Sequence, residues 1–328
     1  MNLTWRPMTG GDIPACHPLV LDRFVYDDDS WRQIPALWRE LLTTGYAESA
    51  VIEDRDRPPG SQMVGFCLLV FLTNDFVTAA KGCLPPYINL QILKRWRNGN
   101  SPILNREAVR RANSGPGLNL LVFHEWVELF SEFNGAGRPV REKAIQVFFE
   151  MGAGYRLKEM LIEVYGDVQK QFNLNGGLQV RRDYGTFFER GVPLPAPVQR
   201  PFLLGLTRDE AHALEGSAMS LFFSYSAPQF FLRRGEQEML RYALLGQTDG
   251  EIAATLSLAP ATLKKRWLSV YERVSSQDHD LLPAGAGQEQ TRGLGKKQRL
   301  LDYLRAHPEE LRPIIKPKGE CLAGRSIR

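Results

Sequence analysis

The sequence contains few cysteines and no long apolar segment. Its four cysteines, Cys16, Cys67, Cys83 and Cys321, have no CxxC spacing, which argues against a disulfide framework and a zinc site. The longest apolar run, residues 64–72, is too short to cross a bilayer, which needs about 20 residues. The first residues lack the basic and apolar regions of a signal peptide. These absences predict a cytoplasmic protein without a membrane partner or a metal.

The composition is that of an ordinary globular protein with material for two cores. The chain has 328 residues, of which 43% are hydrophobic and 24% are charged, and a length of this order favours two domains. The net charge of +4 is unevenly distributed, because residues 292–328 hold ten Lys or Arg and only four Asp or Glu. Positive charge is therefore concentrated near the C-terminus.

The first 190 residues alternate between strand-like and helix-like patterns. Residues 3–7, 49–53, 63–72 and 118–129 have the apolar content of strands, and residues 29–45 have apolar side chains at helical spacing. This alternation predicts an α/β or α+β domain over residues 1–190. A proline-rich and glycine-rich region, residues 83–117, is expected to be an insertion with some helix.

Four prolines within the stretch GVPLPAPVQRP indicate an extended linker after residue 190. We therefore expect a linker and connecting segment over residues 191–228. An all-α domain over residues 229–276 and a basic extension over residues 277–328 follow it. Thr207 and Glu210 have the spacing of a capping box, which predicts a short helix after the prolines.

Three helices are expected between Arg233 and Val274. The first ends near Gly246, a residue suited to terminating a helix. Thr248 and Glu251 form a capping box at the start of the second. Pro260 stands where the third helix should begin, and its missing N–H costs nothing at that position.

Leu263, Trp267, Val270 and Val274 recur at helical spacing, so they define the buried face of the third helix. Lys264, Lys265 and Leu268 are then directed outward, and Arg266 lies on the flank. Two short helices and an outward-facing third are typical of a helix-turn-helix, whose third helix enters the major groove of DNA.

The segment from EQEMLR to LSVYERV closely resembles the LuxR-type (GerE-like) helix-turn-helix of bacterial transcription regulators. The resemblance implies binding to double-stranded DNA as a homodimer. The DNA-binding residues it implies are Thr262, Lys264, Lys265, Arg266, Leu268 and Thr248. The sequence departs from the family in two places: Ala259 replaces the usual serine N-cap, and Leu268 replaces a polar residue, which favours an apolar contact with DNA.

The basic run of residues 264–266 also fits a solvated helix face that binds nothing. For the basic tail from Arg292 onward three interpretations stay open. It supplements DNA binding, it packs Leu300, Leu301 and Leu304 against the three helices as an extra helix, or its final dozen residues are disordered.

The order of strands and helices in the first domain resembles the GNAT-type acetyltransferase fold, with RPMTGGDIPA similar to that family's first strand and helix. In active members a glycine-rich loop after the central strand holds the pyrophosphate of acetyl-CoA at a helix N-terminus. The loop that corresponds is Asn134, Gly135, Ala136, Gly137 and Arg138. The loop is imperfect, because the next residue, Pro139, has no amide to donate.

Other chemistry-bearing residues give weaker signals. His124 and Glu125 superficially match a zinc-protease motif, but the second histidine is absent and His124 is better explained as structural. Glu125, Tyr155 and Tyr165 are each able to act as base or acid in acyl transfer, yet the sequence gives no geometry. No catalytic residue is assigned on this basis.

The main prediction is a sequence-specific DNA-binding transcription regulator that is not an enzyme. Its GNAT-like domain would sense a ligand or dimerise without a cofactor. The alternative is a GNAT-type N-acetyltransferase that uses acetyl-CoA or another acyl-CoA and is tethered to DNA or to a partner by the helix-turn-helix. A third hypothesis is a regulator whose degenerate acyl-CoA pocket senses a ligand.

Overall fold

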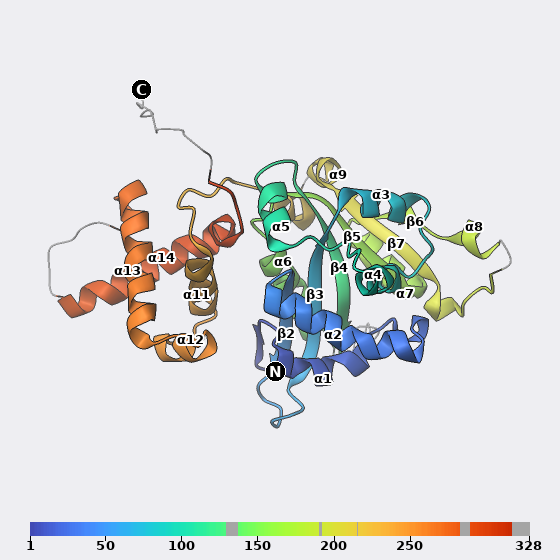
Figure 1. The fold of residues 1–328 in the computed structure, drawn as a ribbon, viewed down its shortest axis with the longest axis horizontal. Helices are drawn as coiled ribbons and strands as arrows, with labels where there is room; N and C mark the ends of the chain where they lie inside the picture. The colour runs from blue at the N-terminus through green and yellow to red at the C-terminus, as the bar shows by residue number, and fades with distance from the viewer. Residues whose placement is uncertain (129–136, 190–191, 215, 283–288, 317–328) are drawn as a thin grey trace. The chain divides into compact units, whose positions relative to one another are not determined.

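The computed structural model describes residues 1–128, 137–189, 192–214, 216–282 and 289–316. The chain divides into two compact units, residues 1–224 and residues 225–328 (Figure 1). A mixed β-sheet with helices on both faces forms the first unit, and the described part of the second is built from helices.

The first unit contains a seven-stranded sheet in the order β1-β2-β3-β4-β5-β7-β6. Its strands are β1 (Leu3–Arg6), β2 (Ala47–Asp54), β3 (Met63–Leu72), β4 (Leu118–Val127), β5 (Leu157–Tyr165), β6 (Gln179–Arg182) and β7 (Pro201–Thr207). Neighbouring strands are antiparallel except β4 and β5, which are parallel. The parallel pair follows from its connection, since the helix between β4 and β5 returns the chain to the same end of the sheet.

Apolar side chains line both faces of the sheet. One core contains Phe66, Leu68, Leu121 and Leu161, and the core on the other face contains Leu69, Leu120, Val122 and Ile162. Successive residues of a strand point to opposite faces, so the continuous apolar runs of β3 and β4 reflect burial on both sides, as expected for central strands.

Helices cover each face of the sheet in the first unit (Figure 1). Helices α2, α3 and α4 pack on the first core, and α5 and α6 pack on the second. The helices are α1 (Ile13–Cys16), α2 (Asp28–Thr44), α3 (Asn74–Gly82), α4 (Ile88–Arg97), α5 (Arg106–Asn113), α6 (Arg138–Gly152), α7 (Gly166–Asn175), α8 (Gly185–Phe188), α9 (Arg208–Ala213) and α10 (Ala218–Phe222).

Helix α2 shows how local sequence sets these boundaries. The Asp27 side chain accepts a hydrogen bond from the Ser30 amide at the N-terminus, and Gly45 ends the helix with φ 70°. Glycine adopts this left-handed conformation at little cost. Between these ends Ile34, Trp38 and Leu41 recur on one buried stripe, which fixes the face that packs on the sheet.

The division between units differs from the predicted boundary after residue 190. Residues 201–207 form β7, which pairs with β5 from Tyr165↔Pro201 to Glu159↔Thr207. The prolines thus lead into an interior strand of the sheet, between β5 and β6, and the predicted linker over residues 191–228 contains β7, α9 and α10. The capping box of Thr207 and Glu210 is present at the start of α9, as predicted.

The second unit contains α11 (Arg234–Leu244), α12 (Asp249–Thr255), α13 (Pro260–Gln277) and α14 (Glu289–Ala306). Thr248 forms the predicted capping box with Glu251, and Pro260 begins α13 as predicted. The predicted stripe of Leu263, Trp267, Val270 and Val274 is buried. The first residues of α12 and α13 and the buried face of α13 are therefore set by capping residues and helical periodicity, which are local features of the sequence.

The tail after residue 277 also contributes to the core of the second unit. Leu300, Leu301 and Leu304 of α14 are buried with α11 and α13 residues in one apolar cluster. Residues 295–306 therefore form the extra packed helix, which is one of the three interpretations of the tail. The final dozen residues, 317–328, lie outside the described residues.

Candidate active site

The parallel strands β4 and β5 separate toward their carboxyl ends. Their pairing runs from Leu118↔Leu157 to Val122↔Ile162 and goes no further, although both strands continue. The β3–β4 register shifts at the same place, where Leu68 pairs with His124 and Leu69 with Val122. Phe123 is therefore the extra residue of a β-bulge, which bends the strand away from its neighbour.

A pocket with about 310 Å³ of empty space, part of it open to solvent, occupies this separation. Its lining residues come from both strands, from the segment before α2, and from α4 and α7. They are Leu21, Asp22, Asn89, Val122, Phe123, His124, Glu125, Ile162, Glu163, Tyr165 and Gln169.

Three carboxyl groups line this pocket and no lysine or arginine does. Burial raises the pKa of Asp22 to about 6, and it raises the pKa values of Glu125 and Glu163 to about 7. Transfer out of water disfavours the charged form of an acid, and a neighbouring cation would offset that cost. The pocket therefore holds acidic groups poised near neutral pH, a property that is frequent in functional sites.

Asp22 is 2% exposed and its two oxygens differ in environment. Oδ2 accepts hydrogen bonds from the Tyr26 hydroxyl at 3.0 Å and from Asn89 Nδ2 at 3.0 Å. Oδ1 is buried without a hydrogen-bond partner among the described residues. His124 Nε2 lies 3.7 Å from Oδ1, beyond hydrogen-bond distance. The hydrogen bonds to Oδ2 thus hold the carboxylate in place, and Oδ1 is available to accept a hydrogen bond.

Both oxygens of Glu163 are engaged by the protein. Oε1 accepts from the Tyr87 amide at 2.9 Å and Oε2 from the Ile88 amide at 2.8 Å, so the carboxylate caps the N-terminus of α4. The Tyr165 hydroxyl lies 3.1 Å from Glu163 Oε2 and 3.4 Å from Asp22 Oδ2, and it bridges the two acids. Glu163 therefore fixes the N-terminus of α4 against β5 at the wall of the pocket.

The ring of His124 is fixed in one neutral tautomer. Trp38 Nε1 lies 3.1 Å from His124 Nδ1, and since an indole N–H only donates, Nδ1 must accept. The ring proton is then on Nε2, which donates to the Tyr26 hydroxyl at 3.1 Å. Burial lowers the pKa of His124 to about 3. These contacts agree with a structural histidine, and they exclude His124 as a base because both ring nitrogens are occupied.

Glu125 lies in the pocket wall on the opposite side of β4 from His124. Successive strand residues alternate in direction, and His124 contacts Trp38 of α2 on the face of the first core. The cross-strand partner of Glu125 is Cys67, which packs on the second core. The sequence also indicated Tyr155 and Tyr165 as acids or bases. Tyr165 lines the pocket, whereas the Tyr155 hydroxyl donates to Glu48 outside it.

The loop that resembles the acyl-CoA loop lies between β4 and α6. Asn134, Gly135 and Ala136 lie outside the described residues, whereas Gly137 and Arg138 are described at the start of α6. Gly137 is the N-cap, no side chain caps the helix, and its first turn contains no acidic residue. The exposed Arg138 side chain pairs with Glu142 at 2.7 Å.

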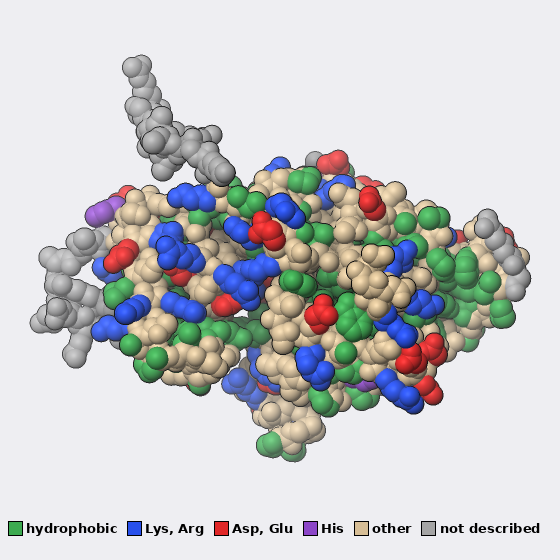
Figure 2. All heavy atoms as spheres, viewed as in Figure 1, with side chains coloured by type: hydrophobic (Ala, Val, Ile, Leu, Met, Phe, Trp, Pro, Cys, Tyr) green, Lys and Arg blue, Asp and Glu red, His purple; other side chains and the backbone are tan. Residues whose placement is uncertain are grey.

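The residues predicted to bind DNA are all in the second unit. Thr248 caps α12, Thr262, Lys264 and Lys265 are exposed on α13, and Leu268 is half exposed. Arg266 instead donates a hydrogen bond to the Gly235 carbonyl of α11 at 3.0 Å. Figure 2 shows basic side chains interspersed with acidic ones over this unit.

The described residues contain no group of His, Cys, Asp and Glu side chains that could hold a metal ion. Among these same residues no helix is long and apolar enough to cross a membrane. Sequence reasoning missed Asp22, Asn89 and Glu163, which are distant from one another in the chain. The signal available for Glu163 was its place within the apolar run LKEMLIEVY, where a charged residue requires a reason.

No family model and no curated protein matches the sequence. Several solved structures are similar to it. NAA60 from Arabidopsis thaliana, in complex with acetyl-CoA, is 10% identical with a TM-score of 0.36, covering 63% of this chain and 99% of that chain. A chimera of spermidine N-acetyltransferase SpeG from Vibrio cholerae and hSSAT is 13% identical with a TM-score of 0.35, covering 68% and 100%. A histone acetyltransferase HPA2 and related acetyltransferase from Corynebacterium glutamicum is 12% identical with a TM-score of 0.33, covering 62% and 96%.

The seven-stranded mixed sheet of the first unit and the helices on its two faces agree with the GNAT-like fold that the resemblance of the sequence predicted. The prediction of a DNA-binding, LuxR-type transcription regulator that is not an enzyme is wrong. The solved structures named above are described as acetyltransferases, and none of them is described as a DNA-binding regulator. The physical reason for the error is that an outward basic helix face fits a solvated surface as well as a DNA contact.

Proposed function

We propose that the chain is an acyl-CoA-dependent N-acyltransferase acting on a small amine. The observation that carries the proposal is the pocket at the separation of β4 and β5. It is small, lined by carboxyl groups whose pKa values lie near neutrality, and has no lysine or arginine in its lining. Such a site is suited to accepting a proton from an amine as it reacts.

The residues present fit an acyl-CoA. The extra residue of the bulge, Phe123, lies beyond the last β4–β5 pair, and its amide is a candidate donor to the thioester carbonyl. Helix α6 begins after β4 with an uncapped N-terminus, which is favourable for the pyrophosphate. We propose that residues 134–138 complete that anion site. The bound acyl-CoA supplies an activated acyl group.

We assign Glu125 as the general base. The amine nitrogen forms a bond to the thioester carbonyl carbon, the carbon–sulfur bond breaks, and the amine proton passes to the Glu125 carboxylate. A pKa of about 7 for Glu125 suits this step at neutral pH. Since an ordinary thiol has a pKa of about 8.5, the same proton can then move from Glu125 to the departing thiolate, which restores the base.

The test is release of free thiol from acetyl-CoA in the presence of a panel of primary amines. We expect turnover by the full chain, and we expect Glu125→Gln to lower kcat by about 10²- to 10⁴-fold. Glu128→Gln is the matched control, because Glu128 follows the same strand but pairs with Arg57 at 2.6 Å outside the pocket. Absence of acetyl-CoA binding in calorimetry, or full activity of Glu125→Gln, would overturn the assignment.

Three expectations from the sequence accompany this proposal. We propose a cytoplasmic location and a homo-oligomeric state, and a solved structure of spermidine N-acetyltransferase from Vibrio cholerae is described as dodecameric. We also propose a helix-turn-helix arrangement for α11 to α13, supported by their capping residues and buried stripe. Sedimentation analysis of the purified chain tests the oligomeric state, and a monomer would contradict it.

A further inference from the structure

Two buried oxygen atoms in the pocket lack a hydrogen-bond donor. Asp22 Oδ1 and Asn89 Oδ1 are both without a partner among the described residues, and their residues are 2% and 6% exposed. Buried polar groups are nearly always paired, because an unpaired one loses its interaction with water without replacement. Two such acceptors on one pocket indicate a ligand that brings donors.

The charge of the pocket points to the class of donor. Asp22 and Glu163 are bridged by Tyr165, and neither acid has a lysine or arginine partner among the lining residues. The aromatic rings of Phe24 and Tyr87 stand beside Tyr165, with ring centroids 5.3 and 6.3 Å from it. Acidic oxygens among aromatic rings favour an organic cation.

The nitrogen bound there differs from the nitrogen that is acylated. An amine held by a carboxylate stays protonated, because a neighbouring negative charge raises its pKa, and an ammonium group has no lone pair for attack. Glu125 lies on the opposite side of β4 from Asp22, whose Oδ1 is 3.7 Å from His124. The two carboxyl groups therefore approach the pocket from opposite sides of β4, and a ligand between β4 and β5 can present one nitrogen to each.

We propose that Asp22 and Asn89 bind an ammonium group of the acyl acceptor that is not itself acylated, so that the acceptor is a diamine. This inference rests on the proposed N-acyltransferase function. In it the charged end of the acceptor donates to Asp22 Oδ1 and Asn89 Oδ1, and the neutral end lies near Glu125 and the thioester.

The test is calorimetric binding of putrescine and cadaverine to the full chain without acetyl-CoA. Butylamine and pentylamine are the matched probes, each lacking one nitrogen. We expect a diamine to bind at least about tenfold more tightly than its monoamine, since a charge-assisted hydrogen bond contributes on that scale. Asp22→Asn and Asn89→Ala should remove most of that difference.

The control variant is Asp209→Asn, which removes one negative charge at an exposed position of α9 and should leave diamine binding unchanged. Thermal unfolding of each variant distinguishes a loss of diamine binding from a loss of folding. Equal affinity for diamines and monoamines, or diamine binding by Asp22→Asn equal to wild type, overturns the inference.

The two proposals fail in different ways. Monoamine acetylation without a preference for diamines would leave the acyltransferase standing and remove the ammonium site. Tight, Asp22-dependent diamine binding without acetyl transfer would do the reverse. In a working enzyme, Asp22→Asn should raise KM for a diamine about tenfold or more while kcat changes less, whereas a purely structural role would lower the activity on monoamines equally.

Discussion

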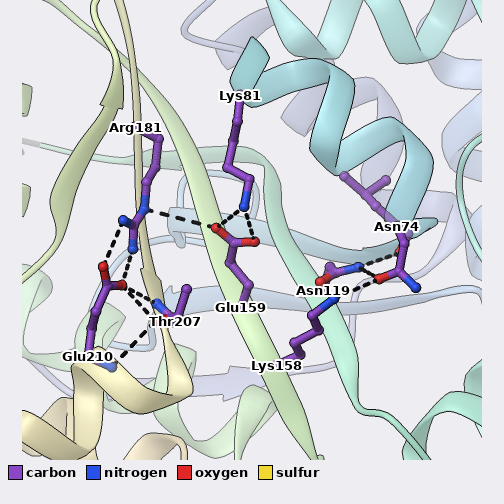
Figure 3. Close-up of polar contacts among 9 residues, drawn as sticks. Asn74, Lys81, Asn119, Lys158, Glu159, Arg181, Thr207 and Glu210 are labelled. Atoms are coloured by element: carbon purple, nitrogen blue, oxygen red, sulfur yellow. Dashed lines mark hydrogen bonds and ion pairs between the residues drawn. The ribbon is translucent and has the colours of Figure 1, made fainter.

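Two groups of buried acids lie on the same face of the sheet, and β5 contributes one glutamate to each. Glu159 is 3% exposed, and Lys81 Nζ lies 2.7 Å from its Oε2 while Arg181 Nε lies 3.9 Å from its Oε1 (Figure 3). Four residues later on the same face, Glu163 and its neighbour Asp22 have no cationic partner among the pocket residues.

The difference shows that this fold can neutralise a buried carboxylate where neutralisation serves stability. Lys81 comes from α3 and Arg181 from β6, so the Glu159 group joins three elements of the first unit, and Arg181 also binds Glu210 of α9 (Figure 3). The hydrogen bond from Arg181 lowers the pKa of Glu210 to about 2. In the pocket burial is left uncompensated, which is typical of a site that is completed by a ligand.

The largest change in stability is expected when the paired group around Glu159 is broken. Glu159→Gln leaves Lys81 and Arg181 without their shared carboxylate, and we expect a loss of about 3 kcal/mol in the free energy of unfolding, the low end for a broken buried pair. Glu107→Gln, in an exposed pair with Arg110, should change it by less than about 0.5 kcal/mol. Urea denaturation measures both, and equal stability of Glu159→Gln and wild type would show that the pairing contributes nothing.

A smaller effect of opposite sign is expected in the pocket. The pKa of folded Asp22, about 6, exceeds its ordinary value, so the folded protein binds this proton more tightly than the unfolded chain. Its stabilising contribution is present below the unfolded pKa and is lost as pH rises through about 6. Asp22→Asn should therefore be more stable than wild type by about 1 to 3 kcal/mol at about pH 8, with a smaller difference near pH 4.

Unfolding curves of wild type and Asp22→Asn across this pH range measure that contribution. A difference in stability that does not change with pH would show that ionisation of Asp22 is not its source. Glu159→Gln provides the contrast, because it should be less stable than wild type at about pH 8. Opposite signs at the two sites would confirm that one is built for stability and the other is not.

The smallest effect concerns geometry within the paired group. Arg181→Lys keeps the charge but loses the two-pronged contact with Glu210, so we expect a loss of about 1 kcal/mol. The exposed Arg234, paired with Glu238, supplies the control Arg234→Lys, for which no measurable change is expected. Thermal unfolding distinguishes them, and identical melting temperatures for wild type and Arg181→Lys would show that charge alone holds this contact.

Local signals in the sequence predicted much of the fold. Thr248 and Pro260 set the starts of two helices, and the apolar stripe of α13 set its buried face, because capping and helical periodicity act within a few residues. The boundary after residue 190 failed for the opposite reason. Prolines mark an extended chain, and only the distant pairing of β7 with β5 decides whether that chain leads to a linker or into a sheet.

The pocket could not be predicted because its residues meet only in three dimensions. Asp22, Asn89 and Glu163 come from separate segments, and the bulge at Phe123 that directs the strand depends on the β3 register. Glu125 was recognised as able to act as a base, and its environment was beyond sequence reasoning. Conversely, the outward face of α13 was predicted well, and the DNA-binding function drawn from it was wrong, because exposure does not name a partner.

The end of the second unit is tied to its beginning. The Glu310 carboxylate accepts from the amides of Gln229 and Phe230 at 2.6 and 3.0 Å, and Gln237 donates to the Arg312 carbonyl at 2.9 Å. During synthesis on the ribosome this unit therefore stays incomplete until residue 312 has emerged, whereas the sheet of the first unit has all its strands once Thr207 is out. Because domains fold in the order in which they are synthesised, the first unit and its pocket can form before the helices of the second unit pack together.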